Sequence, residues 1–233
     1  MSVRLILFDL DGTLVDSRRD ITNAVNHALA PVGIGPATVE EITALVGEGI
    51  SRLMEKLAER EKVTIDTDGA VERFLRFYAA HLVDFTTVYP DVTETLHRLD
   101  GYRKAVISNK REVLTAGVLR EFGLTGFFDV IVGSDTTPER KPSPRPLMYV
   151  VEKFGLSAGE AVMVGDSTYD IQAGRAAGVK TVAVTYGYRP RHMLGDADVL
   201  IDRFAELPDV IATLDGGNRI GKKHEGGHDI FVR

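Results

Sequence analysis

Two acidic residues that directly follow an apolar run are the first chemical signal in the sequence. Asp9 and Asp11 come after the apolar residues 3–8 and before Gly12. Alternate side chains of an extended segment point to the same side, so both carboxylates are expected on one side of the chain. Gly12 allows the sharp turn that ends such a strand. On its own, this pattern is more often a solvated acidic turn than an active site.

A second acidic group changes that interpretation. Asp166 and Asp170 follow another apolar run, residues 161–165. In a parallel sheet, ligands bind beyond the carboxyl ends of the strands, where these acids and Asp9 are expected to meet. Gathered carboxylates repel each other unless a cation lies between them. Mg²⁺ is the natural candidate because it prefers oxygen ligands. Asp170 has an alternative role as an N-terminal helix charge, but we favour the metal site.

Two further segments would complement a phosphate group. Ser108 and Asn109 end a third apolar run and offer a hydroxyl and backbone N–H groups. Lys141 lies in a Pro-rich loop after a fourth run, and its ammonium can act as a point charge on a phosphoryl group. Alone, Lys141 would be an ordinary surface lysine. The four segments together, at successive strand ends, would arise by accident far less often than any one of them alone, and they favour a site that binds a cation and a phosphate.

The elements that must position these side chains form an alternating pattern. Apolar runs with β-branched residues predict strands over 3–8, 104–108, 130–133, 161–165 and 181–184, with a short edge strand over 199–201. Helical patterns separate these runs, which is typical of βαβ units. The fold class predicted is therefore α/β, a Rossmann-like core with a parallel sheet.

The stretch from 16 to 85 has a different character. Its apolar residues recur at helical spacing, and it contains no convincing strand. It is too long for one crossover helix, so it predicts an all-helical cap domain inserted into the core. The predicted organisation is a discontinuous core (1–15 and 86–214), a helical cap (16–85) and a Gly-rich tail (215–233). A hairpin around Gly226–Gly227 is only weakly indicated, and His224 and His228 read as solvated tail residues.

Composition excludes several classes of protein. The 233 residues carry 28 Lys and Arg against 34 Asp and Glu, a net charge of -6, which disfavours partners such as nucleic acid or an anionic membrane. The chain has no Cys, which excludes thiol chemistry and disulfides. Neither a secretory signal nor a membrane-spanning run is apparent, so we expect a cytoplasmic location.

At these motifs the chain resembles the haloacid dehalogenase-like hydrolase superfamily, in particular its phosphoglycolate phosphatase branch. The matching segments are DLDGT (9–13), SN (108–109), Lys141 in KPSPRPL, and GDSTYD (165–170). The resemblance implies that Asp9 is the nucleophile and Asp11 the general acid and base. It implies phosphate binding by Ser108, Asn109 and Lys141, with Lys141 also catalytic. It assigns Mg²⁺ to Asp9, the Asp11 carbonyl, Asp166 and Asp170.

The cap is expected to determine the substrate. Residues 46–49 resemble the cap loop of phosphoglycolate phosphatases, and Gly47, Glu48, Gly49 and Arg52 are the candidate specificity residues. Glycines at a helix start can expose N–H groups to a carboxylate, and Arg52 can pair with one. An interhelix turn followed by a solvated arginine is an equally good interpretation. Arg111 stands where relatives often have Pro, a minor departure.

The function predicted is hydrolysis of a small phosphorylated metabolite, best 2-phosphoglycolate, by a monomer or homodimer. Asp11 favours phosphoester over carbon–halogen cleavage, since an alkoxide needs a proton and a halide does not. A sugar-phosphate phosphatase, a β-phosphoglucomutase-like mutase, a pyrophosphatase and a nucleotidase stay open within the superfamily. Outside it, the alternatives are a phospho-receiver signalling domain, which accumulates phosphate only once, and a non-catalytic nucleotide-binding module.

Overall fold

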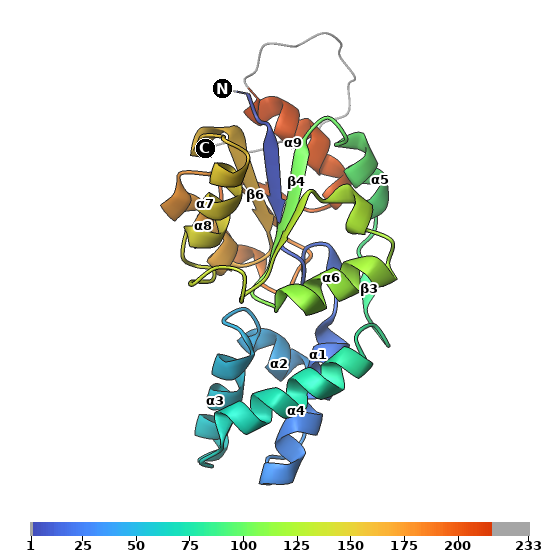
Figure 1. Cartoon of the computed structure of the whole chain (residues 1–233), viewed down its shortest axis with the longest axis vertical. Helices are drawn as coiled ribbons and strands as arrows, with labels where there is room; N and C mark the ends of the chain where they lie inside the picture. Colours follow the sequence, from blue (N-terminus) through green and yellow to red (C-terminus); the bar gives the residue numbers. More distant parts are fainter. Residues whose placement is uncertain (1, 216–233) are drawn as a thin grey trace.

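The core is built on one parallel sheet. The computed structural model describes residues 2–215, and the sheet has six strands in the order β5-β4-β1-β6-β7-β8 (Figure 1). Its strands are β1 (Leu5–Phe8), β4 (Arg103–Ile107), β5 (Val130–Val132), β6 (Ala161–Gly165), β7 (Lys180–Val184) and β8 (Val199–Ile201). All five neighbouring pairs are parallel. The first strand is thus central, with β4 and β6 on either side.

Helices cover both faces of this sheet. Alternate residues of β1 enter different apolar clusters: Leu5 and Leu7 pack with the cluster under α7 and α8, whereas Ile6 and Phe8 pack on the opposite face. The helices of the core are α5 (Val92–Arg98), α6 (Glu112–Glu121), α7 (Arg145–Lys153), α8 (Thr168–Ala177) and α9 (Leu207–Leu214). Burial on both faces explains why the strands are continuous apolar runs.

Short 3₁₀ turns complete the connections. They are η1 (Ala30–Val32), η2 (Thr125–Phe127), η3 (Ala158–Glu160), η4 (Arg191–Met193) and η5 (Phe204–Glu206). No helix among the residues that the structure describes is long and apolar enough to cross a lipid bilayer.

Four helices form a separate layer beyond the carboxyl end of the sheet, drawn in blue to blue-green in Figure 1. They are α1 (Arg18–Leu29), α2 (Val39–Leu45), α3 (Ile50–Glu61) and α4 (Thr67–Ala80). Their inward faces make an apolar cluster of their own, which also takes in Leu114 from α6 of the core. The layer therefore has a core of its own and meets the sheet domain at α6.

The two chain segments that join cap and core are fastened to each other. Strands β2 (Val15–Asp16) and β3 (Thr87–Val88) form a small antiparallel ribbon. The buried Asp20 carboxylate accepts hydrogen bonds from the backbone N–H groups of Phe85 and Thr86, 2.7–3.1 Å long, and from the Thr86 hydroxyl at 2.7 Å. These contacts fix where the chain leaves the core and where it returns.

The predicted fold class is confirmed. Each predicted strand is present within one or two residues at either end, and the 199–201 edge strand has the predicted bounds. The β2–β3 ribbon and helix α2 were not predicted, because two paired residues carry no periodic signal and α2 is only seven residues long. The predicted hairpin around Gly226–Gly227 lies outside the described residues, as do His224 and His228.

Candidate active site

The predicted site residues of the core meet at the carboxyl edge of the sheet. Asp9 follows β1, Ser108 follows β4 and Asp166 follows β6, while Lys141 comes from the loop between β5 and α7. Backbone hydrogen bonds to the neighbouring strand fix two of these residues. The Asp9 N–H donates to the Val164 carbonyl at 2.9 Å, and the Ser108 N–H donates to the Val132 carbonyl at 2.9 Å. The sheet therefore delivers the side chains to one place from separate parts of the chain.

The buried ammonium of Lys141 lies at the centre of this group. It donates to Asp9 Oδ1 at 2.8 Å, to Asp170 Oδ1 at 2.6 Å and to the Ile107 carbonyl at 2.6 Å. Burial opposes the charged form, but Asp170 and Asp9 together hold the pKa of Lys141 above its ordinary value. Lys141 is thus a fixed positive charge and not the solvated surface lysine of the alternative interpretation.

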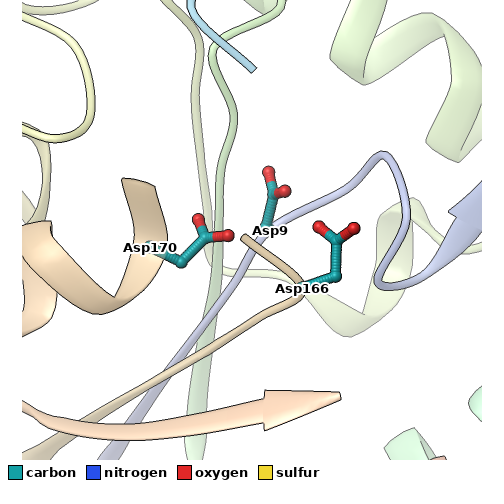
Figure 2. Close-up of side chains that lie close together, drawn as sticks. All are labelled: Asp9, Asp166 and Asp170. Carbon is teal, nitrogen blue, oxygen red and sulfur yellow. The ribbon is translucent and has the colours of Figure 1, made fainter. Parts of the chain in front are cut away.

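Three carboxylates surround a space large enough for a cation. Asp9, Asp166 and Asp170 each offer one oxygen, and these oxygens lie within 4.8 Å of one another (Figure 2). Burial raises the pKa of Asp9 to about 7, with Asp170 adding to the effect and Lys141 opposing it. Burial and the neighbouring Asp9 raise the pKa of Asp166 well above its usual range.

This arrangement fits a bound metal ion. One ammonium faces three buried carboxylates, so the ionised cluster carries an uncompensated negative charge that a cation would neutralise. All three donors are carboxylate oxygens, the ligand type that hard divalent cations prefer. The residues present therefore suit such an ion, and Asp9, Asp166 and Asp170 would hold it.

Asp170 takes part both in a helix cap and in the acidic cluster. One of its oxygens, Oδ2, accepts from the Ser167 N–H at 3.0 Å and the Ser167 hydroxyl at 2.6 Å, which caps the N-terminus of α8. The other, Oδ1, contacts Lys141 and faces the carboxylate cluster. Helix capping therefore holds Asp170 in the orientation that the cluster needs.

Small residues make room for Asp166. A Cβ placed on Gly12 would lie 2.3 Å from Asp166 Oδ2, and one on Gly187 would lie 2.2 Å from the Asp166 Cβ. Gly12 also has a φ of +90°, a conformation that residues with a side chain rarely adopt. The Tyr188 N–H donates to Asp166 Oδ2 at 2.5 Å. The glycines and this hydrogen bond together fix the carboxylate.

Asp11 lies apart from the carboxylate cluster, in a network that reaches the cap. Its carboxylate accepts from Lys110 Nζ at 2.6 Å and from the Ser17 hydroxyl. Lys110 also donates to the hydroxyl of Tyr78, on α4 of the cap, at 2.8 Å. The Tyr188 hydroxyl lies 3.1 Å from that of Ser17. The Asp11 carboxylate is therefore held between core and cap, outside the cluster of Asp9, Asp166 and Asp170.

Asn109 joins core and cap through its side chain. Its amide nitrogen donates to the Gly47 carbonyl at 2.6 Å and to the Lys141 carbonyl at 2.8 Å. Arg189 makes a similar bridge: its guanidinium donates to the carbonyl of Thr43 at 2.8 Å and to that of Val46, at the end of α2. Both residues therefore hold the cap against the core through cap carbonyl oxygens.

The four cap residues chosen from the sequence separate into two groups. Gly47 and Gly49 line the cavity between cap and core, but Glu48 and Arg52 do not. Arg52 forms ion pairs with Glu48, Glu55 and Glu59 on α3 and the loop before it. Glu48 accepts from Lys56 at 2.5 Å and from the Tyr169 hydroxyl at 2.6 Å, and these contacts lower its pKa.

Several cavity residues were not identified from the sequence. Lys110, Arg111, Arg140, Tyr188 and Arg189 all line the cavity. Lys110 was the easiest to find, since it directly follows Ser108 and Asn109. Arg140 precedes Lys141, but an arginine in a Pro-rich loop carries no signal of its own. Tyr188 and Arg189 come from the loop after β7, which matches none of the four segments singled out from the sequence.

The fold and site define a class: parallel α/β proteins with a helical layer beyond the sheet, and an acidic cluster with a buried lysine at the sheet edge. The family model for the haloacid dehalogenase-like hydrolases matches residues 6–184. The chain belongs to this family, in its phosphoglycolate phosphatase-like branch, and is a phosphatase.

Individual relatives agree with this assignment. The chain is 41% identical over 216 residues to a phosphoglycolate phosphatase from Chromobacterium violaceum, covering 90% of this chain and 96% of the relative. It is 40% identical over 209 residues to one from Agrobacterium fabrum, covering 87% and 90%. The crystal structure of a predicted phosphoglycolate phosphatase from Haemophilus somnus superposes with a TM-score of 0.84 at 32% identity, covering 90% of this chain and 98% of that one.

Proposed function

We propose that this phosphatase is a Mg²⁺-dependent phosphomonoester hydrolase that acts through an aspartyl-phosphate intermediate, with 2-phosphoglycolate as its best substrate. The observation that carries the proposal is the meeting of Asp9, Asp166, Asp170 and Lys141 at one sheet edge, with Asp11 close by. The names of the relatives at about 40% identity support the substrate.

In this proposal Asp9 attacks phosphorus and forms a covalent bond to it, which divides a difficult displacement into two easier ones. Asp11 protonates the departing alkoxide and then takes a proton from the water that hydrolyses the intermediate. The Ser108 hydroxyl, the Asn109 backbone N–H and Lys141 hold the phosphate oxygens as negative charge develops. Mg²⁺, held by Asp9, Asp166, Asp170 and the Asp11 carbonyl, would supply charge neutralisation.

Recognition of the substrate carboxylate is proposed at the cap side of the cavity. Gly47 and Gly49 line the cavity, whereas the guanidinium of Arg52 is engaged with three glutamates. Arg140 also lines the cavity: its Nη1 would lie 3.2 Å from a Cβ placed on Gly49. This position favours Arg140 over Arg52 as the partner of the carboxylate.

The test is a screen of phosphate release with Mg²⁺ and with EDTA across 2-phosphoglycolate, sugar phosphates, nucleotides and pyrophosphate. We expect the highest kcat/KM for 2-phosphoglycolate and no turnover in EDTA. A flat profile would refute the phosphoglycolate assignment but leave the hydrolase intact. Isomerisation of a sugar phosphate without phosphate release would favour a mutase. The expected monomer or homodimer and cytoplasmic location stay predictions.

A further inference from the structure

The cavity between core and cap is larger than a small phosphorylated acid requires. Its volume is about 440 Å³. Cavities of roughly 300–1,000 Å³ commonly bury drug-sized ligands. The organic part of 2-phosphoglycolate is only a two-carbon acid, so its binding at Asp9 would leave much of the cavity free for other atoms.

The two ends of this cavity differ in chemistry. The core end carries the groups expected to hold the phosphate, Asp9, Ser108 and Lys141. Helices α1, α3 and α4 of the cap and α6 of the core contribute an apolar wall, beside the hydroxyl residues Ser51 and Tyr78. Its side chains are Ile21, Leu53, Val71, Phe74, Leu75 and Leu114. All of them belong to, or pack against, the apolar cluster of the cap.

An apolar wall of this extent favours an apolar occupant. Cavities lined by aliphatic and aromatic side chains hold water poorly, since water needs several polar partners there. Each methylene group that moves from water onto such a wall gains free energy. The charged residues of the cavity, including Arg140 and Arg189, lie on core loops and not on these helices. A phosphate at the core end thus directs an attached alkyl or aromatic group toward the apolar wall.

We propose that this wall is a subsite for an apolar leaving group, and that the enzyme also hydrolyses phosphomonoesters of medium-sized alkyl or aryl alcohols. The inference rests on the proposed function and extends its substrate class. The ester P–O bond breaks as the Asp9–phosphorus bond forms, and the departing alkoxide takes a proton from Asp11. Water then releases phosphate and restores Asp9, so the net reaction is ester plus water to alcohol plus phosphate.

The experiment measures kcat/KM with Mg²⁺ for n-alkyl phosphates from methyl to hexyl phosphate, with 2-phosphoglycolate alongside. The leaving-group acidity of the longer alcohols is nearly constant, so the series isolates binding of the alkyl chain. We expect kcat/KM to rise by roughly threefold to fourfold for each added methylene until the wall is covered.

A matched pair of variants locates the effect. Val71→Thr keeps the side-chain volume but puts a hydroxyl into the wall, at a residue that is 8% exposed. It should lower kcat/KM for hexyl phosphate more than for methyl phosphate. Val113→Thr makes the same change on α6 at a residue that is 72% exposed and does not line the cavity. It should leave the dependence on chain length as in the wild type.

The outcomes separate this inference from the proposed function. A kcat/KM that is flat or falls with chain length, while 2-phosphoglycolate is hydrolysed, overturns the apolar subsite alone. If neither the alkyl phosphates nor 2-phosphoglycolate are hydrolysed, the apolar subsite and the proposed function are both refuted. The wild-type series decides the matter even if Val71→Thr does not fold. Equal effects of Val71→Thr and Val113→Thr would contradict the placement of the subsite on the wall.

Discussion

The core and the cap line the same cavity with different chemistry. The core contributes charged and hydroxyl side chains at strand ends, each held by side-chain or backbone hydrogen bonds. The cap contributes mostly apolar side chains, and core residues such as Asn109 and Arg189 bind it through its backbone carbonyls. This difference underlies the proposal that the core carries the reaction and that the cap closes the cavity and selects the organic group.

The largest expected effect is in the core, at Asp9. Asp9→Asn keeps the size of the side chain but removes the nucleophile, so kcat should fall by at least about 10⁴-fold. Asp196→Asn is the matched control, since the Asp196 side chain is highly exposed, pairs with Arg175 and does not line the cavity. Steady-state phosphate release checks both variants. Substantial turnover by Asp9→Asn under Mg²⁺ would remove Asp9 from the role of nucleophile.

A smaller, substrate-dependent effect is expected at Asp11. Asp11→Asn cannot protonate a leaving group, and general acid catalysis commonly contributes about 10²–10⁴-fold. The loss in kcat/KM should therefore be large for an alkyl phosphate and much smaller for p-nitrophenyl phosphate, whose leaving group needs little protonation. Equal losses for the two esters would contradict the role of Asp11 as the acid.

Metal binding should change the pH dependence of stability. The pKa of Asp9 is raised from 3.8 to about 7 in the folded protein. Between these values the folded chain keeps a proton that the unfolded chain has lost, so metal-free stability falls as the pH rises through about 7. Mg²⁺ at a hundredfold excess over its Kd should add about 2.7 kcal/mol to the free energy of unfolding at pH 8. This corresponds to a rise in Tm of roughly 5–10 °C.

Thermal unfolding with Mg²⁺ and with EDTA at pH 5.5 and pH 8 measures this gain. The gain should be smaller at pH 5.5, where protons compete for the carboxylates. Asp166→Asn should lose most of the gain, and it should be more stable than the wild type in EDTA at pH 8, because its buried charge is gone. A Tm gain independent of pH and unchanged in Asp166→Asn would place the metal elsewhere.

The smallest effect is expected where core and cap are joined. Arg189→Met removes the buried guanidinium that donates to two carbonyls at the end of α2. A hydrogen bond to a charged group contributes about 1.5–3 kcal/mol, so weaker closure should raise KM by roughly tenfold or more, with kcat changed less. Arg175→Met, at an exposed arginine of α8, is the control. A loss confined to kcat would instead place Arg189 in the chemical step.

The contrast between core and cap also explains what could be predicted from the sequence. Asp9, Ser108 and Asp166 could be found because buried parallel strands are continuous apolar runs, and a polar residue at their carboxyl ends is conspicuous. Lys141 was singled out only in combination with these segments. The cap sequence has no comparable marker of its cavity-facing residues. Its residues face the cavity only through helix packing that is set by distant parts of the chain. Periodicity therefore identified α1, α3 and α4 but neither α2 nor the cavity wall.

Particular residues illustrate this limit. Arg52 was a reasonable carboxylate partner on sequence grounds, but it forms ion pairs with two glutamates of α3 and with Glu48 in the loop before it. Arg189 is 180 residues beyond Asp9 in the chain, and nothing in its neighbourhood indicates that it binds the end of α2. Contacts between residues this far apart depend on the tertiary structure and could not be read from local pattern.

The most direct test of the central claim is detection of the phosphorylated enzyme. Turnover of 2-phosphoglycolate with Mg²⁺ is quenched by acid at successive times, and the peptide containing Asp9 is examined by mass spectrometry. The account predicts a single phosphoryl group on Asp9 during turnover and none in Asp9→Asn. Phosphate release with no phosphorylated Asp9 at any time, or with the phosphoryl group on another residue, would contradict it.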